Sequence, residues 1–299
     1  MKAKSLQNYT QIHTPVMISE VTNYLNLQPD GIYLDGTIGA GGHATEILTQ
    51  LSIKGRLIGL DRDAEALDIC NKRFGASALP IITYKSSYDN FPKVIGELGI
   101  SKLDGILLDL GLSSMQLNSE TRGFSYNSSG ALDMRFDSEQ SNTAADLINQ
   151  ISEKELSNII FEFGEERHSR KIAKSIKSIK NLLTADDLKE AIRKATPPHK
   201  RNKSLARVFQ AIRIAVNSEL EKLRIFLNIF IDYLAAGGRI IIMSYHSIED
   251  RMVKHAFRSL KQSGKLDVLT KKPVIPSAAE RENNNRSRSA KLRAAERLI

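Results

Sequence analysis

The first third of the chain alternates short apolar runs with segments of helix length, and this rhythm constrains the fold more than any other feature. The apolar runs are flanked by turn residues and cover 31–35, 56–61, 80–84 and 103–109. Between them the sequence predicts helices at 41–51, 63–74 and 90–99. Such alternation predicts an α/β fold with a doubly wound, mostly parallel sheet and right-handed crossovers.

The rhythm stops after Gly111 and returns only at about residue 204. Residues 113–142 are rich in Ser, Asn and Gly, which is typical of loops. The patterns that follow are helical, over 143–149, 153–163, 167–181 and 185–195, and they end before Pro197-Pro198.

Strand and helix patterns resume in the last third of the chain. We expect a helix over 204–235, a turn at 237–238 and a fifth buried strand over 239–244. A second helix over 248–260 and an antiparallel edge pair, 265–270 with 290–298, should follow. The simplest arrangement is one discontinuous domain over residues 1–114 and 206–299. A mainly helical insertion at 115–205 would interrupt it.

Positive charge is concentrated in two parts of the chain. The formal net charge is +9, but residues 167–207 carry thirteen basic and three acidic residues, and residues 251–299 carry thirteen basic and four acidic ones. The remainder is therefore acidic, at −10. This polarisation favours a polyanionic partner, most commonly nucleic acid, over the alternative of two solvated helical faces.

The single cysteine, Cys70, excludes an internal disulfide framework and a cysteine-rich zinc site. The six histidines show no metal-binding helical spacing, so we expect no metal. The first fourteen residues are polar, and no apolar run approaches the ~18 residues of a membrane span. We therefore expect a cytoplasmic protein that does not engage a membrane.

A glycine-rich segment, Asp35 to Ala44, follows the first predicted strand and opens the first helix. Glycines allow a tight turn and a close approach to a ligand, and a helix N-terminus offers free N–H groups. Asp61 ends the second strand 22 residues after Gly39, where a carboxylate can accept hydrogen bonds from ribose hydroxyls. The alternative is that Asp61 caps the next helix, a role that Asp63 fills equally well.

Two further acids separate the candidate adenosine cofactors. Asp35 ends the first strand and Asp109 ends the fourth, at the edge of the sheet where ligands bind. Their negative charge suits the sulfonium of S-adenosylmethionine and repels a pyrophosphate. The residues therefore favour a methyltransferase over a nicotinamide-dependent dehydrogenase, which stays open at this point.

The chain closely resembles the MraW-type bacterial 16S ribosomal RNA (cytosine-N4) methyltransferases, through motifs that run nearly end to end. In order they are His13-Thr-Pro-Val16, Asp35-Gly-Thr-Ile-Gly-Ala-Gly-Gly-His43, Asp61-Arg-Asp63, Asp104-Gly-Ile-Leu-Leu-Asp-Leu-Gly-Leu-Ser-Ser114 with Gln116, Arg122-Gly-Phe-Ser125, Leu132-Asp-Met-Arg135, Gly164-Glu-Glu-Arg167, Phe209-Gln-Ala-Ile-Arg-Ile-Ala-Val-Asn-Ser-Glu-Leu220 and Ser244-Tyr-His-Ser-Ile-Glu-Asp-Arg251.

The resemblance implies S-adenosylmethionine as cofactor, a cytidine of small-subunit ribosomal RNA as substrate, the free RNA or the small ribosomal subunit as partner, and a homodimer. It makes the first domain the methyltransferase domain and the insertion the RNA-recognition domain. The family's cofactor contacts fall on Gly41, Gly42, His43, Asp61, Tyr88, Asp109 and Gln116.

The cytosine N4 amine is a poor nucleophile, so a catalyst must orient it, accept its hydrogen bonds and let a proton leave. We expect Asp109, or a backbone carbonyl near it, to accept the hydrogen bonds of the amine. Many amino-methylating enzymes have an Asp/Asn-Pro-Pro-aromatic motif at this point, and this chain has Asp109-Leu-Gly-Leu-Ser-Ser instead. Cys70 is expected to pack rather than react. The alternatives are methylation of another RNA base or of protein, and a non-catalytic RNA-binding assembly factor.

Other residues have both a functional and a structural interpretation. Tyr245 and His246 follow the fifth strand and either contact an extruded cytosine or build the turn. Phe124 is a stacking candidate and Arg135 a phosphate or carboxylate partner, unless both anchor the loop. In the insertion, a helix face with Arg170, Lys174, Lys177 and Lys180, and the basic loop 197–203, are expected to meet phosphates.

Overall fold

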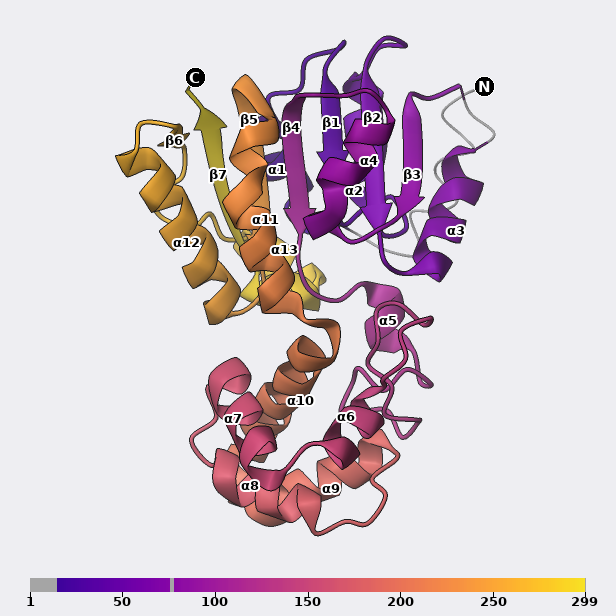
Figure 1. Cartoon of the computed structure of the whole chain (residues 1–299), viewed down its shortest axis with the longest axis vertical. Helices are drawn as coiled ribbons and strands as arrows, with labels where there is room; N and C mark the ends of the chain where they lie inside the picture. The colour runs from indigo at the N-terminus through magenta and orange to yellow at the C-terminus, as the bar shows by residue number, and fades with distance from the viewer. Residues whose placement is uncertain (1–14, 76–77, 299) are drawn as a thin grey trace. The chain divides into compact units, whose positions relative to one another are not determined.

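The computed structural model describes residues 15–75 and 78–298, so His13 of the first motif lies outside the described residues. Within these residues the strands form a seven-stranded sheet of order β3-β2-β1-β4-β5-β7-β6 (Figure 1). The strands are β1 (Ile32–Asp35), β2 (Arg56–Asp61), β3 (Ile81–Lys85), β4 (Leu103–Asp109), β5 (Leu234–Ser244), β6 (Leu266–Val268) and β7 (Lys291–Arg297).

The strand pairing confirms the predicted fold class. Strands β1 to β5 pair in parallel, while β7 pairs antiparallel with both β5 and β6. The predicted antiparallel edge pair therefore exists, and the rest of the sheet is parallel. The four apolar runs of the first third became β1 to β4; β1, β2 and β4 are largely buried between two layers of helices, whereas β3 is an edge strand with Ile82 exposed.

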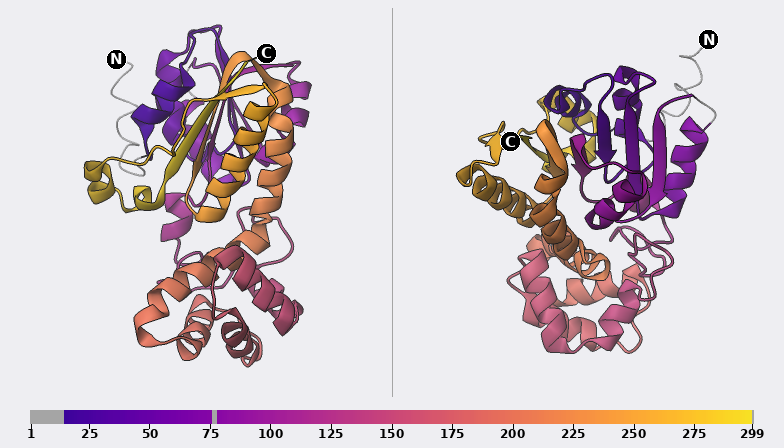
Figure 2. Two further views of the ribbon diagram at one scale, coloured as in Figure 1. Left: turned by 90° about the vertical axis from the view of Figure 1, so that its left-hand side faces the viewer. Right: turned by 45° about the horizontal axis from the view of Figure 1, so that its top comes forward.

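Two layers of helices cover the sheet (Figure 2). Side chains of α1 (Ile18–Leu25), α2 (Gly42–Gln50) and α3 (Ala64–Phe74) share one apolar cluster with one face of the strands. Those of α4 (Phe91–Glu97), α11 (Glu219–Tyr233) and α12 (Ser247–Gln262) share another cluster with the opposite face. The shorter elements of this unit are η2 (Tyr88–Asn90), α13 (Ala278–Asn283) and η4 (Asn285–Ser289).

The segment between β4 and α11 forms a second compact unit with its own core. Its elements are α5 (Ser114–Asn118), α6 (Ala144–Gln150), α7 (Glu153–Gly164), α8 (Ser169–Lys177), α9 (Ala185–Ala195), η3 (Pro198–Lys200) and α10 (Arg201–Asn217). Capping boxes at Thr143, Ser152 and Thr184 set where α6, α7 and α9 begin. This unit is mainly helical, as the sequence predicted.

The chain returns to the first unit later than the sequence indicated. The second unit runs from Leu112 to Leu220, whereas the return was expected at residue 206. The reason is α10, whose Leu205, Val208 and Ile212 are buried in the helical core. Helical periodicity alone cannot say against which core an amphipathic helix packs.

The helix predicted over 204–235 is divided in two at Ser218. Ser218 has a left-handed φ of 52° and ends α10. The bend is held by a bidentate ion pair, because Arg213 donates to both carboxylate oxygens of Glu219 at 2.8 and 2.9 Å. Two polar residues six positions apart do not alter the hydrophobic periodicity of a helix, so the sequence pattern did not reveal this bend.

The Gly237-Gly238 turn was also predicted wrongly, since both residues lie inside β5. The register changes there: Leu234 pairs with Leu103, and the next pairing joins Arg239 to Gly105. Gly237 takes a φ of 74° within this irregularity. The glycines therefore form a bulge in a longer strand rather than a turn before a shorter one.

Among the helices of residues 15–75 and 78–298, none combines the length and the apolar character needed to span a bilayer.

Asn217 ties the long loop of the helical unit to the end of α10. Its Oδ1 accepts from the Phe136 N–H at 2.8 Å, and its Nδ2 donates to the carbonyls of Met134 and Arg213 at 2.7 and 2.9 Å. We predict that Asn217→Ala destabilises the helical unit by about 2 to 4 kcal/mol, because three buried polar groups lose their partner. Thermal unfolding measures this, with the exposed Asn228→Ala as control; equal melting temperatures for the two variants would contradict it.

Candidate active site

Three carboxylates end three adjacent strands at one edge of the sheet. Asp35 is the last residue of β1, which lies between β2 and β4. Asp35 pairs with Gly59 on one side and Leu107 on the other, so Asp61 and Asp109 stand two residues further along. The strand order reverses around β1, and ligands of open α/β sheets bind at the carboxyl end of such a switch point.

The glycine-rich loop forms hydrogen bonds with all three of these acidic residues. The Thr37 N–H donates to Asp35 Oδ1 at 3.1 Å, and the Gly39 N–H donates to Asp61 Oδ2 at 2.8 Å. The hydroxyl oxygen of Thr37 accepts from the Asp109 N–H at 2.7 Å. The loop is thus anchored to the ends of all three strands.

Glycine is required at two positions of this loop. Gly39 and Gly41 have φ values of 52° and 81°, in the left-handed region. A Cβ on Gly41 would also lie 2.4 Å from the Phe74 ring, which packs beneath the loop. Gly42 follows as the first residue of α2, so the loop leads directly into the helix N-terminus.

Asp109 has partners on both carboxylate oxygens. The Tyr245 hydroxyl donates to Oδ1 at 2.7 Å, and the buried His43 places Nε2 3.7 Å from Oδ2. Burial works to raise the pKa of Asp109, but His43, the Tyr245 hydroxyl and the charge of Arg286 lower it on balance. Asp109 is therefore a carboxylate that stays ionised and is held in a fixed orientation.

Asp35 and Asp61 respond to burial in the opposite way. Burial raises the pKa of Asp35 to about 7, with the charge of His43 and the Thr37 N–H opposing it. Burial raises the pKa of Asp61 to about 6, against hydrogen bonds from the Asp63 and Gly39 N–H groups. The site thus concentrates negative charge that a bound cation would stabilise.

Tyr245 and His246 proved to have different roles. Tyr245 belongs to the acid cluster, where burial and the charge of Asp109 raise the pKa of its hydroxyl well above 10, so it remains a donor. His246 instead begins α12 as its cap, with Nδ1 accepting from the Glu249 N–H and Nε2 3.2 Å from the Glu249 carboxylate. Of the two interpretations, His246 therefore takes the structural one.

The helix-cap alternative for Asp61 is resolved in favour of Asp63. The Asp63 side chain accepts from the Glu65 N–H at the start of α3. Asp61 accepts instead from the Gly39 and Asp63 N–H groups, so its carboxylate faces the glycine loop.

Two of the expected cofactor contacts come from segments other than the strand ends and the glycine loop. Tyr88 is half-buried beside Gly36, and its ring meets Phe226 edge to face at 5.8 Å between centroids. Gln116 lies in the helical unit, buried in a capping box in which its Oε1 accepts from the Ser113 N–H at 3.0 Å. A Ser-x-x-Gln pattern is the sequence signal of that box.

Several candidates have structural roles. Phe124 is buried and stacks on Phe136, so its ring is not available to a base. Arg135 donates from Nε and Nη2 to both oxygens of Asp133, which makes it a loop anchor rather than a free phosphate partner. Cys70 is fully buried and burial raises the pKa of its thiol to about 12, as expected of a packing residue.

Two residues of the site were missed by sequence reasoning. Thr37 joins Asp35 to Asp109, and its signal was the Asp-x-Thr spacing of a local turn. Arg286, from η4, acts on both Asp109 and Tyr245 through its charge. No local motif marks Arg286, because only the fold brings the C-terminal segment to the ends of β4 and β5.

Known proteins resemble this chain over nearly its whole length. The family profile described as "MraW methylase family" matches residues 10–298. Ribosomal RNA small subunit methyltransferase H of Kosmotoga olearia is 46% identical over 298 residues, with 98% of this chain and 99% of that protein covered. The protein of the same name from Thermosipho africanus is 48% identical over 297 residues, with 98% and 100% covered. The crystal structure of an rRNA methylase from Streptococcus thermophilus aligns with a TM-score of 0.46 at 12% identity, over 94% of this chain and 96% of that one.

Because of Asp35, we expect the free energy of unfolding of the ligand-free protein to fall as the pH rises. Its folded pKa of about 7 lies above the ordinary aspartate pKa of 3.8, so the folded state binds the proton more tightly and loses stability as the pH rises between those two values. Asp35→Asn should therefore stabilise the protein at pH 8 by up to about 4 kcal/mol, and by much less near pH 4. Thermal unfolding at both pH values, with the exposed Asp232→Asn as control, measures this; a gain independent of pH would refute the assignment.

Proposed function

The chain belongs to the MraW methylase family, and from that premise we propose that it transfers a methyl group from S-adenosylmethionine to the exocyclic N4 amine of a cytidine in 16S ribosomal RNA. The observation that carries this proposal is the constellation at the switch point, where Asp35, Asp61 and Asp109 surround a glycine loop. It occurs in a chain that matches proteins named small-subunit rRNA methyltransferases over nearly their full length.

The residues of the site fit a cationic adenosine cofactor. Asp61 is placed to accept hydrogen bonds from ribose hydroxyls, and Gly39, whose missing Cβ would lie 4.0 Å from the Asp61 carboxylate, leaves room beside it. Asp35 and Asp109 supply the negative charge that a sulfonium requires. His43 Nε2 is a buried polar atom without a hydrogen-bond partner, available to a ligand. When bound, S-adenosylmethionine supplies an activated methyl group next to a positive sulfur.

Tyr88, Gln116, Gly41 and Gly42 complete the cofactor set that the family resemblance implies. Tyr88 begins η2, three residues after β3 ends, and its side chain lies next to Gly36. The backbone of Gly41 and Gly42 forms the junction between the loop and the N-terminus of α2.

Asp109 is our candidate for the catalytic residue. Its lowered pKa keeps it ionised at neutral pH, so it can accept hydrogen bonds from the N4 amine and localise the nitrogen lone pair. The Tyr245 hydroxyl restrains Oδ1 of this carboxylate, and His43 Nε2 lies 3.7 Å from Oδ2, which pre-organises the acceptor. Tyr245 is thus a positioning residue for Asp109.

The helical unit is the proposed RNA-recognition domain. On α8, Arg170 and Lys174 are exposed while Ile172 and Ile176 are buried, so one face of the helix is basic. Lys177 differs from its neighbours, because its Nζ donates to the carbonyl of Ile148 at 2.7 Å. An assembled small subunit and free RNA both present the phosphates that such a face attracts, in the cytoplasm where ribosomes are built.

The product of the reaction tests the proposal. Small ribosomal subunits or their RNA are incubated with methyl-labelled S-adenosylmethionine, and the RNA is digested to nucleosides. We expect N4-methylated cytidine. Label in another nucleoside or in ribosomal protein would give a different acceptor, and no label would favour a non-catalytic RNA-binding assembly factor. Sedimentation of the pure protein tests the homodimer that the resemblance adds.

Asp109→Asn should reduce methylation by about 10²- to 10⁴-fold, because a neutral amide is a weak proton acceptor. Asp104→Asn, near the other end of the same strand, is the matched control. Asp104 has a structural role there, because it accepts a hydrogen bond from the Ile32 backbone N–H. Rate and cofactor affinity are measured separately. Normal methylation with normal cofactor binding in Asp109→Ala would rule out both roles of this residue.

Tyr245→Phe gives a sharper readout of the positioning role. Without the hydroxyl donor the pKa of Asp109 should rise, so the acid limb of the rate profile should move to higher pH while the maximal rate changes less. An unmoved acid limb would mean that Tyr245 only packs.

A further inference from the structure

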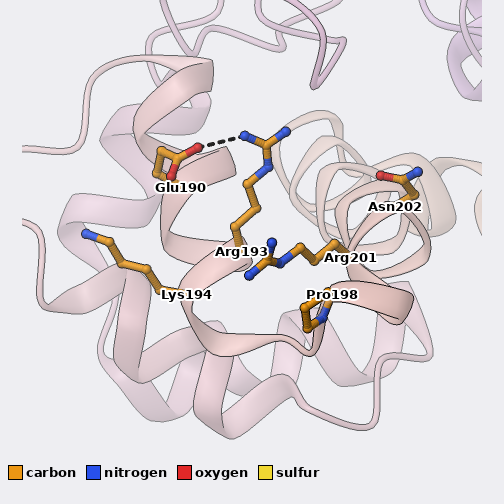
Figure 3. Close-up of a pocket in the computed structure, with 6 residues that line it drawn as sticks. All are labelled: Glu190, Arg193, Lys194, Pro198, Arg201 and Asn202. Atoms are coloured by element: carbon orange, nitrogen blue, oxygen red, sulfur yellow. Dashed lines mark hydrogen bonds and ion pairs between the residues drawn. The ribbon is translucent and has the colours of Figure 1, made fainter.

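A pocket in the helical unit lies outside the acid cluster described above. It has a volume of about 340 Å³ and is lined by Glu190, Arg193 and Lys194 of α9 and by Pro198, Arg201 and Asn202 at the start of α10 (Figure 3). Figure 3 shows the Arg201 side chain extending from α10 towards α9. Three cations and one acid therefore share a single concave surface.

In the part of the chain that the structure describes, one of the three cations of this pocket is paired and two are not. Glu190 pairs with Arg193, at 2.9 Å between Oε1 and Nη1, and this ion pair is exposed. Within the described residues, neither Lys194 nor Arg201 has a side-chain partner, and Arg201 Nε is buried without a hydrogen bond. A buried guanidinium N–H without an acceptor is unfavourable, so the arrangement indicates an acceptor from outside the chain.

The start of α10 adds to this positive field. Helices α6, α7 and α9 begin with a capping box and acidic residues in the first turn. Helix α10, with 17 residues, has no side-chain cap and no acid in its first turn. No acid of its own first turn therefore offsets the N-terminal dipole beside Arg201 and Asn202.

We propose that this pocket binds a phosphate group of the RNA backbone. The inference rests on the proposed function only in taking RNA as the substrate. The planar guanidinium of Arg201 can donate to two phosphate oxygens, while Lys194 contributes a point charge at the rim. Because a phosphate contact carries no base information, the pocket fixes the position of the RNA rather than choosing the cytidine.

The test compares two double variants that each remove two positive charges. Lys194→Gln with Arg201→Gln empties the pocket of its unpaired cations and breaks no bond within the protein. The matched control is Lys54→Gln with Lys93→Gln, both exposed and in the other unit. Binding of each full-length protein to a fragment of small-subunit ribosomal RNA is measured over a range of salt concentrations, together with cofactor affinity and thermal unfolding.

We expect the pocket variant to bind RNA about tenfold more weakly at low salt, with a slope of log affinity against log salt reduced by about 1. The control variant should keep the affinity and slope of the unmodified protein, and all three should bind cofactor equally. Unchanged RNA affinity and slope in the pocket variant would overturn the proposal.

The outcome for the pocket is separate from that for the enzymatic function. If the unmodified protein produces N4-methylated cytidine and the pocket variant still binds RNA normally, only the pocket assignment fails. If the pocket variant loses RNA affinity but the unmodified protein transfers no methyl group, the phosphate site stands and the proposed reaction fails.

Discussion

The hydrogen bonds between the glycine loop and the strand ends are the interactions on which the site depends. Three carboxylates at adjacent strand ends repel one another, and burial makes their charges more costly. The backbone N–H groups of Thr37 and Gly39 offset part of this cost for Asp35 and Asp61. The Tyr245 hydroxyl and His43 do the same for Asp109. The strand register brings the three acids together, and the loop supplies N–H donors to two of them.

The part of the ionisation free energy that the protein does not offset indicates which kind of ligand the site suits. Asp35 and Asp61 keep pKa values raised to about 7 and about 6, so the folded protein alone does not stabilise their ionised forms fully. A structural carboxylate normally gains enough partners to lower its pKa, as Asp133 does with Arg135. Asp133 is therefore a structural anchor, whereas Asp35 is a carboxyl group whose ionised form a positively charged ligand would stabilise.

Much of the fold was predictable from sequence, since buried parallel strands appear as apolar runs and the order of elements limits the topology. The acids were found because Asp35, Asp61 and Asp109 each end such a run. What failed depended on long-range packing. Ser218 bends the chain only because Arg213 and Glu219 pair across it, and Phe124 is buried only because Phe136 stacks upon it. Neither partner is marked by periodicity.

In the proposed function, the basic charge of residues 167–207 and the acids at the sheet edge meet two opposite electrostatic requirements, while the basic residues of 251–299 lie in the same unit as those acids. A cationic cofactor needs acids at the end of the sheet, while RNA needs cations on the helical unit. Inserting the basic helices as a separate unit after Gly111 lets each charge set form around its own core. Arg201, whose buried Nε has no hydrogen-bond partner, and Asp35, whose pKa burial raises, are the groups that the two proposed ligands would stabilise.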